Sequence, residues 1–110
     1  MIKYDIVIDS MVEKQINDIF EYTAHHLANE QSAFAILERI KACIRKLEFF
    51  PESHPLVERE PWRSLGVRKT YVNSLIIYFY VDGIGNKVHV LAIVHSKRNQ
   101  FNQINKLKSD

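Results

Sequence analysis

The residues best suited to chemistry lie in the second half of the chain, where bases outnumber acids. Residues 1–55 carry 6 Lys or Arg against 9 Asp or Glu, and residues 56–110 carry 9 against 4, so the halves have formal charges of −3 and +5. Between Arg63 and Lys108 the only acid is Asp82, and the bases there are Arg63, Arg68, Lys69, Lys87, Lys97, Arg98, Lys106 and Lys108. This imbalance favours an anionic partner, although solvated strand and tail residues would give the same count.

Three further residues could act beside these bases. His95 could transfer protons near neutral pH, or it could be a strand-end histidine bonded to backbone. Trp62, next to Arg63 in a proline-rich stretch, could stack on a nucleotide base or could simply cover the helices. Tyr78 lies in an apolar run and is a core residue more often than a catalytic one. For Arg68 the alternative role is a salt bridge to a helix carboxylate.

Metal and thiol chemistry are not expected. His25 and His26 are neighbours on a helix and point about 100° apart, and His89 and His95 stand roughly 20 Å apart on one strand. We therefore predict no metal site and no cofactor. Cys43 is the single cysteine and falls on an apolar helical stripe, which favours a structural thiol and excludes an internal disulfide.

Periodicity predicts the elements that position these residues. Residues 2–8 alternate like a strand, and Ser10 with Glu13 has the spacing of a capping box that starts a helix ending near Asn29. A second apolar stripe predicts another helix, joined by a short connection at residues 30–32 and closed by Pro51. We expect an ordered surface loop over residues 52–65, followed by the three strands 67–72, 75–81 and 87–94.

This order predicts an α+β fold, β-α-α-β-β-β, in which two antiparallel helices cover one face of a mostly antiparallel four-stranded sheet. With 110 residues, we expect a single domain over 1–110. The strands 75–81 and 88–94 are apolar on both faces, but the two helices can cover only one face of the sheet. We therefore expect the free chain to expose an apolar groove on the other face, which a partner fills. The turn at 82–86 contains two glycines suited to positive φ.

Composition argues against an intrinsically disordered chain, a collagen and a coiled coil. Hydrophobic residues make up 46% and charged residues 25%, which are globular values. No apolar run approaches the ~18 residues of a membrane span, and the N-terminal residues 1–10 contain an acid and no small-residue cleavage site. We expect a cytoplasmic protein with no membrane association.

A series of short motifs runs along the chain: residues 4–8 followed by Ser10, Leu47 to Pro51 with Pro55, Gly66-Val67-Arg68-Lys69, Ile76-Ile77-Tyr78 with Val81-Asp82, and residues 90–95 followed by Lys97-Arg98. In the order and spacing of these motifs, the chain resembles the RelE/ParE superfamily of toxins from bacterial type II toxin-antitoxin modules over nearly its whole length. The resemblance implies a toxin that a cognate antitoxin wraps and holds inactive. Homo-oligomers and toxin-antitoxin hetero-oligomers are both compatible with it.

The resemblance also implies two modes of action. Some members are metal-independent endoribonucleases that cleave messenger RNA on the ribosome, and others inhibit DNA gyrase without catalysing a reaction. The catalytic candidates that it implies are His95, Arg68 and Arg98, with Lys97 and Tyr78 secondary, and the target-binding candidates are Arg68, Lys69, Lys97, Arg98, Trp62 and Arg63.

Two departures bear on the choice between these modes. Thr70 stands where ribonuclease members commonly have a second base, and Leu75 stands where they have an arginine. Less charge is then available to stabilise a transition state on phosphate. We therefore favour the gyrase-directed mode over ribosome-dependent cleavage, and a non-toxic interaction module of the same fold is the third hypothesis.

Overall fold

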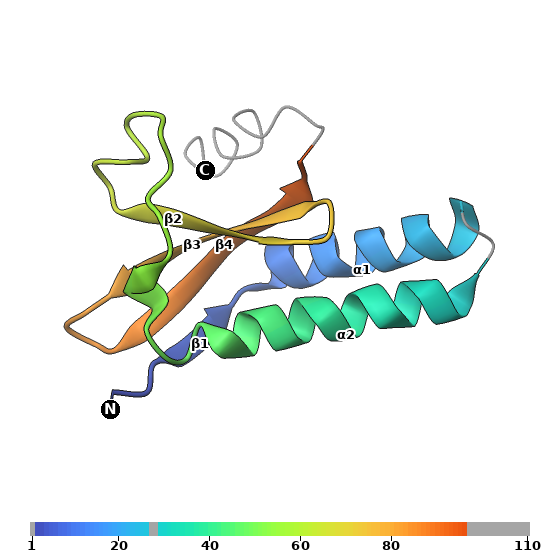
Figure 1. Cartoon of the computed structure of the whole chain (residues 1–110), viewed down its shortest axis with the longest axis horizontal. Helices are drawn as coiled ribbons and strands as arrows, with labels where there is room; N and C mark the ends of the chain where they lie inside the picture. The colour runs from blue at the N-terminus through green and yellow to red at the C-terminus, as the bar shows by residue number, and fades with distance from the viewer. Residues whose placement is uncertain (1, 27–28, 97–110) are drawn as a thin grey trace.

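The computed structural model describes residues 2–26 and 29–96 of the chain. Its elements follow the predicted order of strand, two helices and three strands, with one short 3-10 helix between them (Figure 1): β1 Asp5–Ile8, α1 Ser10–His26, α2 Glu30–Lys46, η1 Pro51–Ser53, β2 Val67–Val72, β3 Leu75–Asp82 and β4 Lys87–His95. The four strands form one sheet in the order β1-β4-β3-β2. β1 is parallel to β4 and the other neighbours are antiparallel, which confirms the predicted α+β fold.

The beginnings of both helices differ from the predicted ones. The Asp9 carboxylate accepts from the Val12 amide at 3.0 Å, so Asp9 caps α1, and the predicted capping role of Ser10 is wrong. α2 begins at Glu30, because the Asn29 side chain accepts from the Ser32 amide at 3.2 Å. The connection predicted at residues 30–32 is therefore wrong, since these residues form the first turn of α2.

The two hairpin turns use asparagine where the backbone turns left-handed. Asn73 has φ 53° between β2 and β3, and Asn86 has φ 52° between β3 and β4. The expectation that Gly83 and Gly85 supply positive φ is wrong, because neither glycine has it. Asparagine tolerates this region better than other side chains do, and here it takes the place of glycine.

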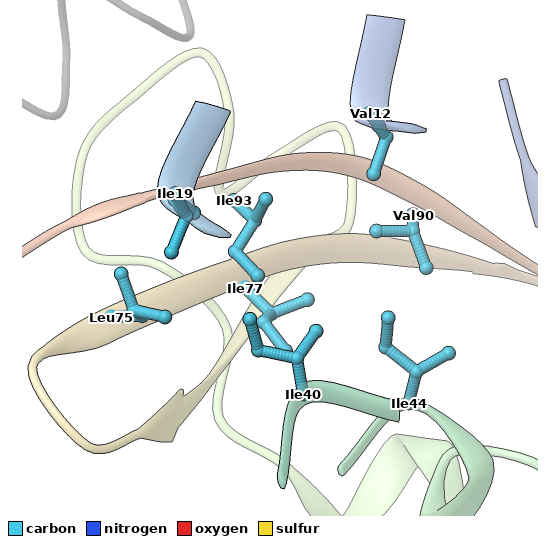
Figure 2. Close-up of a cluster of buried hydrophobic side chains, with 8 residues drawn as sticks. All are labelled: Val12, Ile19, Ile40, Ile44, Leu75, Ile77, Val90 and Ile93. Carbon is cyan, nitrogen blue, oxygen red and sulfur yellow. The ribbon is translucent and has the colours of Figure 1, made fainter. Parts of the chain in front are cut away.

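The main core lies between the helices and the sheet. Figure 2 shows its eight buried side chains, two each from α1, α2, β3 and β4: Val12, Ile19, Ile40, Ile44, Leu75, Ile77, Val90 and Ile93. At the other end of the sheet Tyr4, Leu47, Phe79 and Val88 form a smaller cluster. We call the side of the sheet that carries these residues the helix face.

The opposite side of the sheet, which we call the loop face, is covered by residues 54–66. Val57 and Trp62 from this segment pack on strand residues in one cluster with Val67, Ile76, Tyr78, Ala92 and Val94. Ile76, Tyr78 and Ala92 are each no more than 1% exposed. The predicted ordered loop is thus confirmed. The expectation that the free chain exposes an apolar groove on this face is wrong, because the chain itself supplies the second covering.

An irregularity in β4 changes which face its later residues occupy. Phe79 is opposite Val90 and Tyr78 is opposite Ala92, so Leu91 is an extra residue in β4. Before it, His89 lies beside Tyr80 on the loop face, with the two rings stacked 4.7 Å apart. After it, His95 is on the helix face. His89 and His95 therefore lie on opposite faces of the sheet, although they are an even number of positions apart along β4.

Candidate functional site

Arg68 projects from β2 to the residue that follows η1, where it is bonded to its own chain. Its Nη1 donates to the backbone carbonyl of His54 at 2.6 Å, and the side chain is half-buried. The His54 ring lies edge-on to Phe79 at 5.7 Å. Burial first, and the Arg68 charge second, lower the pKa of His54 below its usual value. Arg68 therefore helps to hold the 54–66 segment through a backbone carbonyl, whereas a helix carboxylate was the predicted structural partner.

Lys69 and Tyr78 lie opposite each other on the loop face. The Lys69 ammonium lies over the Tyr71 ring, 5.7 Å from its centroid. Tyr78 is 1% exposed, and burial, with Tyr71 as a smaller cause, raises its pKa to about 12. Its hydroxyl therefore stays protonated at neutral pH. Tyr78 is a core residue in this arrangement, and because its hydroxyl stays protonated it is a poor general base.

Trp62 and Arg63 lie in the turn structure of the covering loop. Trp62 is 7% exposed and packs on the loop face, so its ring covers the sheet and not the helices. The Arg63 side chain is exposed, and its Nη1 donates to the Val57 carbonyl at 3.2 Å. Gly66 ends the turn with φ 85°, a conformation that favours glycine. Both predicted target-binding residues of this loop thus contribute to its own structure.

His95 lines an open cavity of about 400 Å³ between α1 and the end of β4. Its ring meets the Tyr22 ring edge-on at 5.7 Å. Nearby, the Gln15 side chain accepts from the Ile93 amide at 3.0 Å and so occupies part of the β4 edge beyond the end of β1. Lys97 and Arg98, the bases expected beside His95, lie outside the described residues.

The structure does not bring Arg68 and His95 together. Arg68 is opposite Phe79, and His95 is opposite Leu75 on the other side of β3. These positions are separated by two strand spacings of about 4.8 Å and by four residues, or about 13 Å, along the strands. The two described catalytic candidates therefore belong to opposite corners of the sheet.

A second surface was missed by the sequence prediction. An apolar groove of about 480 Å³ opens between α1, α2 and β1, and it is lined by Ile6, Ile8, Glu13, Ile16, Leu37, Ile40, Lys41, Ile44 and Arg45. A neighbouring hollow of about 420 Å³ shares Glu13, Ile16 and Leu37 and adds Asn17, Phe20 and Phe34. We call the two together the helix groove. The one sequence signal for it is Phe34, a large apolar residue outside the core stripe of α2 and 54% exposed.

The two edges of the sheet are built differently. Residues 55–57 run along β2, where the Val57 amide donates to the Val67 carbonyl at 2.9 Å and the Lys69 amide donates to the Pro55 carbonyl at 3.1 Å. β1 is the opposite edge, and within the described part of the chain its only strand partner is β4. The β1 edge also borders the helix groove through Ile6 and Ile8.

The described residues offer no other type of site. Between residues 2 and 96, apart from 27 and 28, no three His, Cys, Asp or Glu side chains gather as a metal site would require. Neither α1 nor α2 is long and apolar enough to cross a membrane.

Comparison with known proteins identifies the family. The sequence profile of the ParE toxins, described as the toxin of the parDE type II toxin-antitoxin system, matches residues 6–100. The chain belongs to this family. The match includes both helices, the covering loop and all of β2, β3 and β4, so the predicted RelE/ParE membership is confirmed. A search of curated protein sequences gives no match.

Solved structures support the fold. The chromosomal ParDE system from P. aeruginosa superposes with a TM-score of 0.70 at 14% identity, covering 86% of this chain and 98% of that one. The RelBE2 toxin-antitoxin complex from Mycobacterium tuberculosis gives 0.59 at 12% identity over 86% and 99% of the two chains. A mutant of the E. coli toxin RelE in the free state gives 0.65 at 13% identity over 96% and 97%. At such identities the likeness shows the ParE-family fold alone.

Proposed function

We propose that the chain is the growth-arresting toxin of a parDE-type module, that it acts in the cytoplasm on DNA gyrase, and that it does so by binding, without catalysing a reaction. The observation that carries this proposal is the match of residues 6–100 to the ParE toxins. Ribosome-dependent cleavage of messenger RNA is the alternative that the test must separate from it.

The arrangement of the predicted catalytic residues supports a binding mode. Cleavage through the 2′-hydroxyl needs a general base, a general acid and cations that meet at one phosphate. In the part of the chain that the structure describes, these groups do not meet. The Arg68 guanidinium is bonded to the His54 carbonyl, and the pKa of Tyr78 is raised to about 12. His95 lies at the opposite corner of the sheet.

The two departures from the ribonuclease pattern also have structural roles here. Leu75 is 2% exposed and belongs to the core of the helix face. Thr70 faces α2, with its hydroxyl 4.0 Å from the Cys43 sulfur. Neither position supplies a positive charge for a phosphate, which is consistent with a toxin that does not cleave RNA.

The antitoxin, the partner expected of a ParE-family toxin, would bind in the helix groove and along β1. An amphipathic helix can place its apolar face in such a groove, and an extended segment can add a strand to an open edge. The groove carries Glu13 at one wall and Lys41 and Arg45 at another, so it can orient a helix of mixed charge. The β2 edge is already hydrogen-bonded to residues 55–57 and would not accept a strand.

The test compares two activities of one purified preparation. We expect the chain to inhibit supercoiling by purified gyrase, and we expect the antitoxin encoded by the neighbouring gene to relieve the inhibition. Primer extension on ribosome-bound message should show no new ends. Cuts at defined codon positions that disappear in His95→Ala, with gyrase unaffected, would establish the ribonuclease alternative. If the chain neither inhibits supercoiling nor causes cuts in the message, the interaction-module hypothesis remains.

A further inference from the structure

Two adjacent aromatic residues project into solvent between α2 and η1. Phe49 is 43% exposed and Phe50 is 65% exposed. The segment lies at the end of the molecule that also holds the N-terminus and the β3–β4 hairpin (Figure 1). Two main-chain bonds join these parts, from the Tyr4 amide to the Glu48 carbonyl at 2.8 Å and from the Asp5 amide to the Asn86 carbonyl at 2.9 Å. We call residues 49 and 50 the Phe49–Phe50 turn.

Phe50 occupies a backbone conformation that suits a different residue. Its φ of 52° and ψ of 45° lie in the left-handed region, and the residue that follows it is Pro51. A bulky side chain is strained there, and a following proline disfavours helical backbone angles further. The other described residues with positive φ are Asn73, Asn86 and Gly66, the types that tolerate it. At this one position the chain keeps a large apolar side chain where asparagine would be more stable.

The backbone of the turn is held by hydrogen bonds to the Phe50 carbonyl. The Phe50 carbonyl accepts from the Ser53 amide at 3.0 Å and from the Ser53 hydroxyl at 2.8 Å. Pro51 is buried beneath it. Rigid aromatic groups lose little conformational entropy on binding, and aromatic residues are enriched in protein interfaces.

The bases next to the turn are available, whereas the two flanking acids, Glu48 and Glu52, each contact a residue of the N-terminal segment. Arg45 and Lys46 are exposed in the last turn of α2, and no described carboxylate forms an ion pair with either side chain. Glu48, the nearest acid along the chain, is paired with Lys3 at 3.3 Å. By contrast, the guanidinium groups of Arg63 and Arg68 are bonded to carbonyls of their own chain. The described part of the molecule thus combines unpaired bases with exposed aromatic rings at this turn.

We infer that the Phe49–Phe50 turn is the anchor by which the chain docks on its target, inserting Phe50 into an apolar pocket of an acidic protein surface while Lys46 contacts the acidic rim. The inference rests on the proposed function, because it assigns the surface through which the toxin meets its target. A contact between Phe50 and another protein would explain why a strained and exposed position carries an aromatic residue. The antitoxin, in contrast, would occupy the helix groove.

The decisive variant is Phe50→Asn, which removes the ring and relieves the backbone strain. We expect its thermal midpoint to rise by about 3 °C. We expect growth arrest on induction in bacteria to be lost at matched expression, with the affinity for the target falling about tenfold or more. Binding of the antitoxin should be unchanged. A stability gain combined with a loss of toxicity is not expected of a residue with a purely structural role.

Ile84→Asn is the matched control, because Ile84 is 101% exposed, lies in the β3–β4 turn at the same end of the molecule and has no positive φ. It should leave stability and growth arrest unchanged. Full growth arrest by Phe50→Asn, or loss of its antitoxin binding, would overturn the inference. A supercoiling assay with wild-type chain judges the gyrase proposal separately, because growth arrest reports the anchor whatever the target.

A charge series tests the acidic rim. Lys46→Gln should weaken growth arrest, and Lys46→Glu should weaken it further, since a like charge on both surfaces repels. Equal toxicity of Lys46→Glu and the wild-type chain would overturn the assignment of an acidic partner.

Discussion

The two edges of the sheet differ in what completes them. At the β2 edge the chain supplies its own covering, with residues 55–57 bonded along the strand and Trp62 packed behind them. At the β1 edge the described residues supply no further strand, and an apolar groove lies beside it. Exposed strand edges pair readily with other chains, and proteins cover those that are not used. This difference is the reason we propose that the antitoxin binds at the β1 edge.

The same contrast holds for the aromatic residues near each edge. Trp62 at the covered edge is 7% exposed, whereas Phe34 in the helix groove is 54% exposed and meets only the Phe20 ring, edge-on at 4.9 Å, among the aromatic rings of the described residues. A buried ring contributes to folding, and an exposed ring can contribute to binding. Substitutions at the two places should therefore separate stability from partner affinity.

The largest expected effect is that of Trp62→Ala on stability. Removal of the ring leaves a cavity among Val57, Tyr78 and Ala92, and we expect the free energy of unfolding to fall by about 3–5 kcal/mol, as measured by urea titration. The Val57 and Lys69 amides should lose protection from hydrogen exchange, because they hold the loop to β2. Leu65→Ala in the same loop, where the side chain is 63% exposed, should change stability by less than about 0.5 kcal/mol. Equal effects of the two substitutions would show that the covering of β2 is not held by Trp62.

A smaller effect, on binding, is expected for Phe34→Ala. We expect it to weaken antitoxin binding about 30-fold, which corresponds to about 2 kcal/mol, measured by calorimetry. The free energy of unfolding should change by less than about 1 kcal/mol, because the ring is more exposed than buried. Tyr71→Ala is the control, since Tyr71 is 56% exposed but lies on β2. If Tyr71→Ala weakened binding as much as Phe34→Ala, the antitoxin would not distinguish the two edges.

Much of the fold could be predicted because its signals are local. Alternation and helical stripes placed every strand and both helices within a few residues, and the apolar character of β3 on both faces correctly required a second covering. The caps were less predictable because aspartate, serine and asparagine side chains compete for the same amides. Asp9 precedes Ser10 and takes the Val12 amide, a choice that spacing alone does not decide.

Which face the candidate His95 occupies could not be predicted, because one extra residue in β4 reverses the alternation of faces. Leu91 shifts the alternation of β4, so His95 faces α1 while His89 faces the other side, and no local pattern marks this position. The bases on β2 were expected at the surface, but the covering loop offers backbone carbonyls that only the folded chain brings near Arg68. Contacts of this kind depend on tertiary structure, and a pattern of residue types contains little information about them.

The smallest expected effect is on the pH dependence of stability. We expect it to arise from His54, in the loop that covers the β2 edge. The pKa of His54 is lowered in the fold, first by burial and second by Arg68, so the unfolded chain binds a proton more readily than the folded chain does. Stability should therefore be complete above the unfolded value of about 6.5 and should fall as the pH drops from there through the lowered folded pKa. We expect thermal midpoints measured between pH 8 and pH 5 to decline less in His54→Gln than in the wild-type chain. His25→Gln should keep the wild-type decline, because the His25 side chain is exposed on α1 and is not part of the loop over β2. If the thermal midpoints of His54→Gln and the wild-type chain declined equally with falling pH, protonation of His54 would not destabilise the fold.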